Sequence, residues 1–257
     1  VLTGKGLEFG GSLVRTEATG YGAVYFMQDM LSEAGDDFTG KTVLISGSGN
    51  VATHAAEKVL QLGGTPLTLS DSGGFILADG GLTQEQIDWV KDLKGLRRGR
   101  ISEAADEFGN ISFHEGQRPW GVEADCAAPC ATQNEVNGEE AATMLKNGVK
   151  AIAEGANMPC TIEAVHSFQK ARILFAPGKA ANAGGVAVSG LEMSQNSARI
   201  TWKEDELQQL LRGIMQDIHD KCEQYGRVDK DYVDYVNGLV IEGISTGINA
   251  SMGFLAD

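Results

Sequence analysis

The stretch Thr42-Val-Leu-Ile-Ser-Gly-Ser-Gly-Asn-Val-Ala52 decides the fold of this chain. Its first five residues form a short apolar, partly β-branched run, which predicts a buried strand. The glycine-rich turn that follows leads into a helical pattern up to Leu62. A second run, Pro66-Leu-Thr-Leu-Ser70, predicts another strand that ends at Asp71. Strand, helix and strand in this order predict a β-α-β unit with parallel strands and a right-handed crossover.

The same alternation continues on both sides of this unit. Residues 17–34 carry apolar side chains at helical spacing, and Gly35 follows as a helix stop. Further apolar runs alternate with helical patterns, the runs at 111–114, 125–128, 149–153 and 172–175 and the helices at 83–94, 101–107, 138–146 and 161–170. The alternation predicts an α/β fold, with a Rossmann-like, doubly wound, mostly parallel sheet and helices on both of its faces.

The pattern changes after Ala181, because no strand-like run reappears and the remaining residues look entirely helical. An apolar stripe at steps of three or four follows one helix face, formed by Leu207, Leu211, Ile214, Ile218 and Cys222. We interpret this stripe as core packing in preference to a partner-binding face. We therefore expect the sheet within residues 1–200, and an all-helical C-terminal extension, residues 201–257, that completes the same domain.

The glycine-rich turn matches the pattern G-x-G-x-x-G/A through Gly47, Gly49 and Ala52. Gly47 permits a tight turn, Gly49 lets the backbone approach a pyrophosphate, and Ala52 lets the helix lie close to the strand. The free N–H groups at the helix N-terminus then attract phosphate oxygens. A lone match also fits an ordinary strand-to-helix turn, but here a strand precedes, a helix follows, and Asp71 ends the next strand. Residues 1–200 are therefore predicted to bind a dinucleotide.

A second phosphate-binding pattern occurs at Gly35-Asp-Asp-Phe-Thr-Gly-Lys-Thr42. The phosphate loop with this pattern needs a strand before it and a helix after it. Here a helix precedes and a strand follows, and the two aspartates would oppose phosphate. We interpret this segment as a helix-to-strand turn.

Composition argues against several other classes of protein. The 257 residues are 42% hydrophobic and 22% charged, as in ordinary globular proteins. The net charge of −14 is spread along the chain and disfavours binding to nucleic acid or anionic membranes. The four cysteines form no disulfide framework, and the four histidines complete no zinc spacing. No run approaches the roughly 20 apolar residues of a spanning helix. We expect a cytoplasmic protein with reduced thiols and no metal site.

The choice between NAD and NADP depends on the groups near Asp71. By the general rule, an acidic residue here accepts hydrogen bonds from the ribose 2′-hydroxyl and favours NAD. Downstream, however, this acidic chain carries a cluster of cations, Lys94, Arg97, Arg98 and Arg100. Such cations bind phosphate through charge-assisted hydrogen bonds, and Ser72 offers a hydroxyl donor. These residues alone fit both a 2′-phosphate site and a solvated helix end.

Six phrases, read in order, resemble one family. They are Glu17-Ala-Thr-Gly-Tyr-Gly22, Ser46-Gly-Ser-Gly-Asn-Val-Ala52, Ser70-Asp-Ser72, Pro129-Cys-Ala-Thr-Gln-Asn-Glu135, Ala153-Glu-Gly-Ala-Asn-Met-Pro159 and Ala176-Pro-Gly-Lys-Ala-Ala-Asn-Ala-Gly-Gly-Val186. Over nearly its whole length the chain resembles the C-terminal cofactor-binding domain of the bacterial hexameric, NADP-dependent glutamate dehydrogenases. The order of the phrases is far more specific than the glycine turn alone.

The resemblance implies roles for individual residues. The cofactor-binding residues that it implies are Thr19, Gly47, Gly49, Asn50, Val51, Asp71, Ser72, Lys94, Ala131, Thr132, Asn157 and Asn182. Lys94 stands where NADP-using members place a cation near the 2′-phosphate, so we expect NADP. Thr132, Asn157 and Asn182 border the nicotinamide in the family, although Asn157 would also suit a turn. Ser189 resembles the serine that binds the distal carboxylate of glutamate, although a hydroxyl that caps its own helix turn would look the same.

The family reaction is the reversible oxidative deamination of L-glutamate to 2-oxoglutarate and ammonia. Its acid–base work resembles that of a lysine and an aspartate from a glycine-rich N-terminal domain, and no such phrase occurs here. Lys5, Lys41 and Lys179 lie in other motifs, so we assign no catalytic residue. The chain opens at Val1 without an initiator methionine, and we expect it to begin inside a longer protein. We expect this fragment to be an inactive monomer or weak dimer that binds NADP(H). The full-length protein is expected to be a homohexamer that also binds glutamate and 2-oxoglutarate.

Two other functions fit the same residues. The helical C-terminal third would suit a non-catalytic assembly module whose glycine turn is vestigial. A related amino-acid dehydrogenase with an apolar substrate would keep the cofactor phrases, but such relatives look apolar at the position of Ser189.

Overall fold

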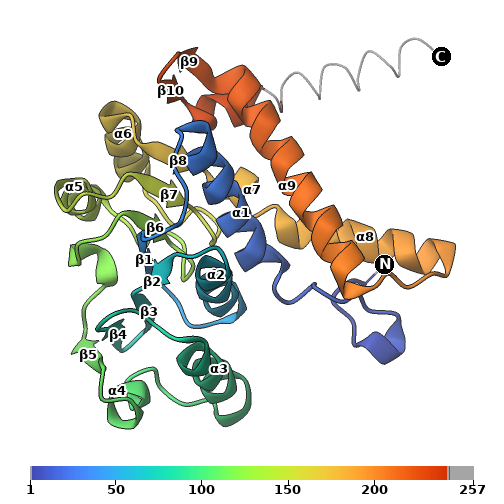
Figure 1. The fold of residues 1–257 in the computed structure, drawn as a ribbon, viewed down its shortest axis with the longest axis horizontal. Helices are drawn as coiled ribbons and strands as arrows, with labels where there is room; N and C mark the ends of the chain where they lie inside the picture. Colours follow the sequence, from blue (N-terminus) through green and yellow to red (C-terminus); the bar gives the residue numbers. More distant parts are fainter. Residues whose placement is uncertain (1, 242, 244–257) are drawn as a thin grey trace.

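The computed structural model describes residues 2–241 and 243, and it shows one parallel sheet between layers of helices (Figure 1). The helices are α1 (Ala18–Glu33), α2 (Asn50–Gln61), α3 (Gln84–Asp92), α4 (Glu103–Glu107), α5 (Gly138–Lys146), α6 (Ile162–Ala171), α7 (Gly178–Ala181), α8 (Gly184–Ala198) and α9 (Glu204–Gly226), with short helical turns η1 (Leu7–Phe9), η2 (Leu93–Arg97) and η3 (Pro119–Gly121). The strands are β1 (Thr42–Ile45), β2 (Thr65–Pro66), β3 (Thr68–Asp71), β4 (Gly74–Ala78), β5 (Ile111–Glu115), β6 (Cys126–Ala128), β7 (Ala151–Ala153), β8 (Leu174–Ala176), β9 (Arg227–Asp229) and β10 (Tyr232–Val233). Among the described residues, no helix has the length and apolar composition needed to cross a membrane.

Side-chain caps fix where several helices begin. The Thr83 hydroxyl accepts a hydrogen bond from the Gln86 amide, and the Gln86 side chain accepts one from the Thr83 amide. Asn137 and Glu140 form the same reciprocal pair at the start of α5. These caps satisfy N–H groups that a first helical turn leaves free. The predicted helix at 138–146 is confirmed with the same bounds.

The central sheet has the strand order β2-β1-β6-β7-β8, and all of its strands are parallel. Helices α1 and α2 cover one face, and α5 and α6 cover the other (Figure 1). The side chains of β1 divide between these layers, because Val43 and Ile45 join the core on the α1 side and Leu44 joins the core on the α5 side. The predicted doubly wound, mostly parallel sheet with helices on both faces is confirmed.

The second predicted strand, 66–70, is interrupted at Leu67 and only its first part pairs with β1. The Thr68 hydroxyl accepts from the Ile45 amide at 2.9 Å and donates to the Ile45 carbonyl at 3.0 Å, so it occupies groups that a continued ladder would use. Strand β3 pairs instead with β4, and β4 with β5, in a separate antiparallel sheet. The predicted strand at 111–114 is therefore real but lies outside the parallel sheet, and β4 was not predicted.

Helix α1 contacts both α2 and α8 backbone to backbone. A Cβ atom added at Gly20 would lie 2.5 Å from the Val51 carbonyl oxygen of α2. A Cβ atom added at Gly184 would lie 2.2 Å from the Ala18 carbonyl oxygen of α1. Figure 1 shows α1 running between these two helices. The first turns of α1, α2 and α8 are thus held in fixed relation by positions where any side chain would clash.

Helix α9 packs on α1 through the predicted apolar stripe, which confirms its interpretation as core. Leu207, Leu211 and Cys222 are buried. Ile214 and Ile218 are only half-buried, and the fully buried residue between them is Met215. The buried residues therefore recur in steps of four along this part of the helix. At the centre of the helix the buried stripe passes through Met215, one residue beyond the predicted Ile214.

The expectation of an entirely helical chain after Ala181 is wrong for the segment that follows α9. Strands β9 and β10 form a short antiparallel hairpin there. The helix stops at Gly226, where an added Cβ would lie 2.4 Å from the Asp234 carbonyl oxygen, and the Asp229 side chain accepts from the Asp231 amide in the turn. Residues 235–241 are helical. The remainder of the predicted helical extension, 242 and 244–257, lies outside the described residues.

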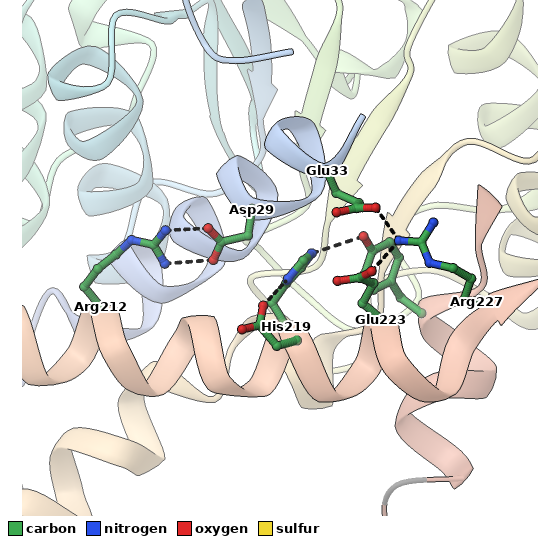
Figure 2. Close-up of polar contacts among 8 residues, drawn as sticks. Asp29, Glu33, Arg212, His219, Glu223 and Arg227 are labelled. Atoms are coloured by element: carbon green, nitrogen blue, oxygen red, sulfur yellow. Dashed lines mark hydrogen bonds and ion pairs between the residues drawn. The ribbon is translucent and has the colours of Figure 1, made fainter. Parts of the chain in front are cut away.

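Two sets of ion pairs fasten this C-terminal part to α1 (Figure 2). Arg212 of α9 donates to both carboxylate oxygens of Asp29, with one bond of 2.8 Å, and Asp29 is buried. Arg227 reaches Glu33 of α1 and Glu223 of α9 together. Because Asp29 has little access to water, its charge depends on Arg212 for compensation.

His219 of α9 lies between these ion pairs (Figure 2) and is also buried. Its Nε2 atom lies 3.1 Å from the Tyr235 hydroxyl, and its Nδ1 atom lies 3.1 Å from the Asp220 carboxylate. Ligand atoms of His219, Asp220 and Glu223 lie within 4.8 Å of one another. Both ring nitrogens are already hydrogen-bonded and Glu223 pairs with Arg227, so we assign no metal to this group.

A polar cluster joins α1, α2 and α3 at the surface. The Tyr21 hydroxyl donates to Glu57 at 2.6 Å, and the Lys91 ammonium group lies 2.9 Å from the same carboxylate. Burial alone would raise the pKa of Glu57, but these two hydrogen bonds outweigh it and hold the pKa below its usual value. Glu57 is therefore ionised and stabilises the folded chain at neutral pH.

The second phosphate-binding pattern is a helix-to-strand turn, as predicted. Helix α1 ends at Glu33, Gly35 follows with a φ of +73°, and β1 begins at Thr42. The Asp37 side chain accepts from the Thr39 amide within the turn. A strand and not a helix follows this loop, so the loop lacks the adjoining helix N-terminus whose N–H groups would bind phosphate.

Candidate functional site

Two adjoining cavities, of about 690 and 500 Å³, lie at the carboxyl ends of the parallel strands. They share Val51, Cys130, Ala131 and Thr132, and together form one trough. We call the cavity around the glycine turn the loop end and the cavity around Asn157 the amide end. The sheet order changes direction between β1 and β6 beside this trough, and ligands of open α/β sheets bind at such switch points.

The structure brings together all the residues predicted to bind the cofactor. The loop end is lined by Gly47, Gly49, Asn50, Asp71, Ser72 and Lys94, the amide end by Thr19, Asn157 and Asn182, and both by the shared Val51, Ala131 and Thr132. These residues come from seven separate segments of the sequence. For the segments that follow β1, β6, β7 and β8, this convergence results from the parallel order of the strands, because their carboxyl ends meet at one edge.

The glycine turn has the geometry expected of each position. Gly47 has a φ of +86°, and an added Cβ would lie 2.9 Å from the Cys130 carbonyl oxygen. Gly49 caps α2, and nothing lies within 4 Å of the position of its missing Cβ. Ser70 fixes the turn, since its hydroxyl accepts from the Gly47 amide at 2.7 Å and its amide donates to the Gly47 carbonyl at 2.9 Å. The backbone at Gly49 is therefore bare and faces open space.

The Asp71 carboxylate is largely occupied by groups of the chain itself. One oxygen accepts from Lys94 and from the Ile101 amide, both at 3.0 Å, and the other accepts from the Gly73 amide at 2.9 Å. Burial alone would raise the pKa of Asp71, but these hydrogen bonds outweigh it and lower the pKa. Asp71 is thus a fixed negative charge with little acceptor capacity left for a ligand.

Two of the four clustered cations line the loop end. Lys94 uses two of its three donors, one on Asp71 and one on the Gly99 carbonyl, which leaves the third for a ligand. Arg100 donates to the Ser72 hydroxyl at 2.8 Å. Arg97 does not line the trough, because its guanidinium lies over the Trp89 ring at 4.5 Å. Arg98 occupies the left-handed position that ends η2 and also lies outside the trough.

Amide groups cluster at the other end of the trough. The Asn182 side chain donates to the Asn157 side chain at 2.8 Å and to the Ala156 carbonyl at 3.2 Å. Thr19 lies beside α8, since a Cβ added at Gly185 would be 2.3 Å from the Thr19 hydroxyl. The amide end therefore offers a row of hydrogen-bonding groups without a formal charge, apart from Arg15 at its margin.

Ser189 lies on α8 beside Arg15 and is not among the described residues that line the trough. Its hydroxyl accepts from the Arg15 guanidinium at 2.9 Å and from the Thr3 hydroxyl at 3.3 Å. Arg15 does line the amide end. The surroundings of Ser189 are thus polar and positively charged, and its hydroxyl is engaged with other side chains.

Two buried glutamates support the loops that form the trough. Glu135 accepts from the amides of Ala131 and Thr132 at 3.0 and 3.3 Å. Glu154 accepts from the amides of Cys160 and Gly178 at 3.2 and 2.7 Å. Burial raises the pKa of both carboxyl groups, and the hydrogen bonds offset this only in part.

Several lining residues were not predicted from the sequence. At the amide end these are Arg15, Gln133, Gly155, Ala156, Gly185 and Val186, and at the loop end they include Gly116, Gln117, Arg118 and Glu135. Glu135, Gly155 and Val186 lie inside the quoted phrases, so those phrases were the available signal. Residues 116–118 follow β5, and nothing in their sequence shows that the antiparallel sheet returns them to the trough.

The fold and the trough together define a Rossmann-like α/β protein. In chain order, the first parallel strand, β1, is followed by the glycine turn and helix α2. The trough lies at the switch point of the sheet, and the N–H groups at the start of α2 are exposed at one end of it.

Comparison with known proteins gives the family. The model of the glutamate/leucine/phenylalanine/valine dehydrogenase family matches residues 10–251, and the chain belongs to this family. It is 53% identical to the NAD(P)-specific glutamate dehydrogenase of Xylanibacter ruminicola over 98% of this chain and 56% of that protein. It is 52% identical to the NADP-specific glutamate dehydrogenase of Escherichia coli over 95% of this chain and 54% of that protein. Plasmodium falciparum glutamate dehydrogenase 2 superposes with a TM-score of 0.91 at 44% identity, over 95% of this chain and 54% of that one. The chain thus spans about half the length of the relatives it matches.

Proposed function

We propose that the trough binds NADP(H), with the pyrophosphate at the start of α2 and the nicotinamide at the amide end. The observation that carries this proposal is the meeting of Lys94, Arg100 and Ser72 beside Asp71. Two cations and a hydroxyl, collected at one end of a trough in a chain of net charge −14, suit a doubly charged phosphate.

The engagement of Asp71 favours NADP over NAD in this proposal. A ribose 2′-hydroxyl needs an acceptor, and Asp71 already accepts three hydrogen bonds from the chain. A 2′-phosphate needs donors, which Lys94 and Arg100 supply. Names of the relatives differ on this point, since that of Escherichia coli is called NADP-specific and that of Xylanibacter ruminicola NAD(P)-specific.

The longer protein is proposed to oxidise L-glutamate reversibly to 2-oxoglutarate and ammonia. Polar, cationic surroundings at Ser189 and Arg15 suit a dicarboxylate better than an apolar amino acid. Among the described residues that line the trough, Lys94 is the only lysine. Its ammonium group is held at the loop end, away from the amide end. We therefore propose that these 257 residues bind the cofactor without turning over glutamate.

The organisation of the chain follows from the same proposal. Residues 1–200 form the dinucleotide-binding part, and 201–257 complete the same domain, which the packing of α9 on α1 supports. The substrate-binding and catalytic domain is proposed to lie in the remainder of a longer, homohexameric protein. We propose that the chain alone is a monomer or weak dimer and that the protein is cytoplasmic, in keeping with the buried thiols of Cys126, Cys130 and Cys160.

Titration of the chain with NADPH, followed by nicotinamide fluorescence, tests the proposal. In the variant Gly49→Val the new side chain would enter open space in the trough, so we expect only a small fall in Tm, from the poorer helix cap, and the loss of NADPH binding. Gly213→Val on α9 is the matched control, because an added Cβ also meets nothing there and the site is remote. Equal binding by both variants would overturn the proposed site. Failure of the wild-type chain to bind either dinucleotide would favour an assembly module, and turnover of glutamate by the chain would contradict its inactivity.

Substrate choice is tested in a full-length relative that shares this chain's residues. Replacing Ser189 with alanine removes the hydroxyl beside Arg15 and is expected to raise the KM for glutamate without changing the KM for NADP. Unchanged kinetics with glutamate would show that Ser189 does not bind the substrate and that its hydroxyl has only a structural role in α8.

A further inference from the structure

Glu154 immediately follows β7, beneath the amide end of the trough. Only 5% of its surface is exposed, and it is not among the described residues that line either cavity. A buried carboxylate is costly unless hydrogen bonds compensate for the lost water. Its place beneath a proposed cofactor site therefore calls for a structural reason.

The carboxylate of Glu154 joins two separate segments of the amide end. One oxygen accepts from the Cys160 amide at 3.2 Å, which closes the loop that carries Asn157. The other accepts from the Gly178 amide at 2.7 Å, at the first residue of α7. Glu154 thus fixes the separation between the end of β7 and the end of β8.

Both segments deliver an asparagine to the trough. Asn157 lies inside the loop that Glu154 closes, and Asn182 lies one turn beyond Gly178, with its amide donating to the Gly178 carbonyl at 2.8 Å. The two side chains meet at 2.8 Å. Because α7 is only four residues long, a shift at Gly178 moves Asn182 directly.

We propose that Glu154 is a positioning residue that holds Asn157 and Asn182 in the arrangement that receives the nicotinamide carboxamide. This inference rests on the proposed function of the trough. It differs from that proposal in assigning a role to a residue that never touches the cofactor.

The chemistry of Glu154 distinguishes it from glutamine of the same shape. The two groups that bond to it are both backbone donors, and a carboxylate is an acceptor on both oxygens. A glutamine amide would present its NH2 group to either the Cys160 or the Gly178 amide, so that two donors face each other. One of the two segments must then move away.

The test compares two ligands of the 257-residue chain, NADPH and adenosine 2′,5′-bisphosphate. The bisphosphate carries only the adenosine and phosphate groups proposed for the loop end. We expect Glu154→Gln to weaken NADPH binding about tenfold, since tenfold corresponds to about 1.4 kcal/mol and this is the scale of one unmade hydrogen bond. Binding of the bisphosphate is expected to stay unchanged.

Asp125→Ala is the control for a loss of stability. One oxygen of the Asp125 carboxylate accepts two hydrogen bonds, from the Thr42 amide and hydroxyl at 2.9 Å each, at the amino end of the parallel strands, and alanine removes this acceptor. This variant is expected to lower Tm and to leave the ratio of the two affinities as in the wild-type chain. The control thereby separates a general loss of stability, which would weaken the binding of both ligands, from a local change at the amide end, which would weaken the binding of NADPH alone.

The outcomes separate the inference from the proposed function. If Glu154→Gln weakens both ligands equally, or weakens neither, Glu154 does not position the amide end. If the wild-type chain binds neither ligand, the proposed function itself fails. If Glu154→Gln does not fold, the same two titrations on Glu154→Asp decide, because the shorter acceptor cannot reach both amides and should again weaken NADPH alone.

Discussion

Replacing Lys94 with alanine is expected to remove most of the proposed preference of this chain for NADPH over NADH. The ammonium group of Lys94 has one donor left after its bonds to Asp71 and the Gly99 carbonyl. In the proposed complex that donor meets the 2′-phosphate, which NADH lacks. Lys94→Ala also leaves the Asp71 charge less compensated, beside the place where the phosphate would bind.

The size of the effect follows from the kind of bond and its exposure. A hydrogen bond between charged groups contributes about 1.5–3 kcal/mol, or roughly tenfold to a hundredfold in affinity. The Lys94 side chain is 25% exposed, so water and salt screen part of the interaction and place the loss toward the lower end. Affinity for NADH should stay nearly constant, because the 2′-hydroxyl gains nothing from a cation.

Fluorescence titrations with both cofactors, at two ionic strengths, measure this difference. Arg97→Ala is the matched control, since Arg97 belongs to the same cationic segment but stacks on Trp89 outside the trough. For Lys94→Ala, the dependence of NADPH affinity on salt should also become weaker. An equal loss of NADPH and NADH affinity, or an equal effect of the Arg97 variant, would refute the assignment of Lys94.

Three further predictions concern stability. Gly184→Ala would place a methyl group 2.2 Å from the Ala18 carbonyl oxygen, so the free energy of unfolding in urea should fall by about 1–3 kcal/mol; an unchanged midpoint would mean that α1 and α8 separate freely. Arg212→Ala leaves Asp29 buried without its partner and should cost about 3 kcal/mol, the lower end of the range for such pairs, because Arg212 is a third exposed; a double variant with Asp29→Asn should recover part of the loss. The folded pKa of Glu57 lies below its unfolded value of about 4.3, so its contribution is present at neutral pH and is lost as pH falls through the folded pKa. The stability difference between the wild-type chain and Glu57→Gln should therefore shrink below about pH 4, and a constant difference in acid denaturation curves would contradict it.

Sequence reasoning worked best where the signal is local. The run from Thr42 to Ala52 contains its own strand, turn and helix start, and the structure confirms each of them. It failed at Thr68, because the run 66–70 is uniformly strand-like and the break arises from a single hydroxyl that bonds to a distant backbone. The short hairpin after α9 was missed for a similar reason. Its residues carry no strong alternation, and contacts made by Gly226 with Asp234 define where the helix stops.

The trough shows the same division between local and distant causes. Motif phrases placed Asp71, Asn157 and Asn182 correctly at the edge of the sheet, because each phrase follows a strand of the chain. They did not show that Asp71 is already occupied, which depends on the Ile101 amide thirty residues downstream. Nor did they separate Lys94 from Arg97, whose direction is set by the π-helical turn η2 and by the ring of Trp89.

The break at Thr68 means that part of the loop end is carried by a different sheet from the amide end. Asp71 and Ser72 sit at the turn of the antiparallel sheet, whereas Asn157 and Asn182 follow strands of the parallel one. Under the proposed function, substitutions in the antiparallel sheet can therefore change the groups offered to a 2′-phosphate while the groups proposed to hold the nicotinamide keep their positions. Cofactor preference and the orientation of the nicotinamide ring would then depend on residues that two different sheets carry.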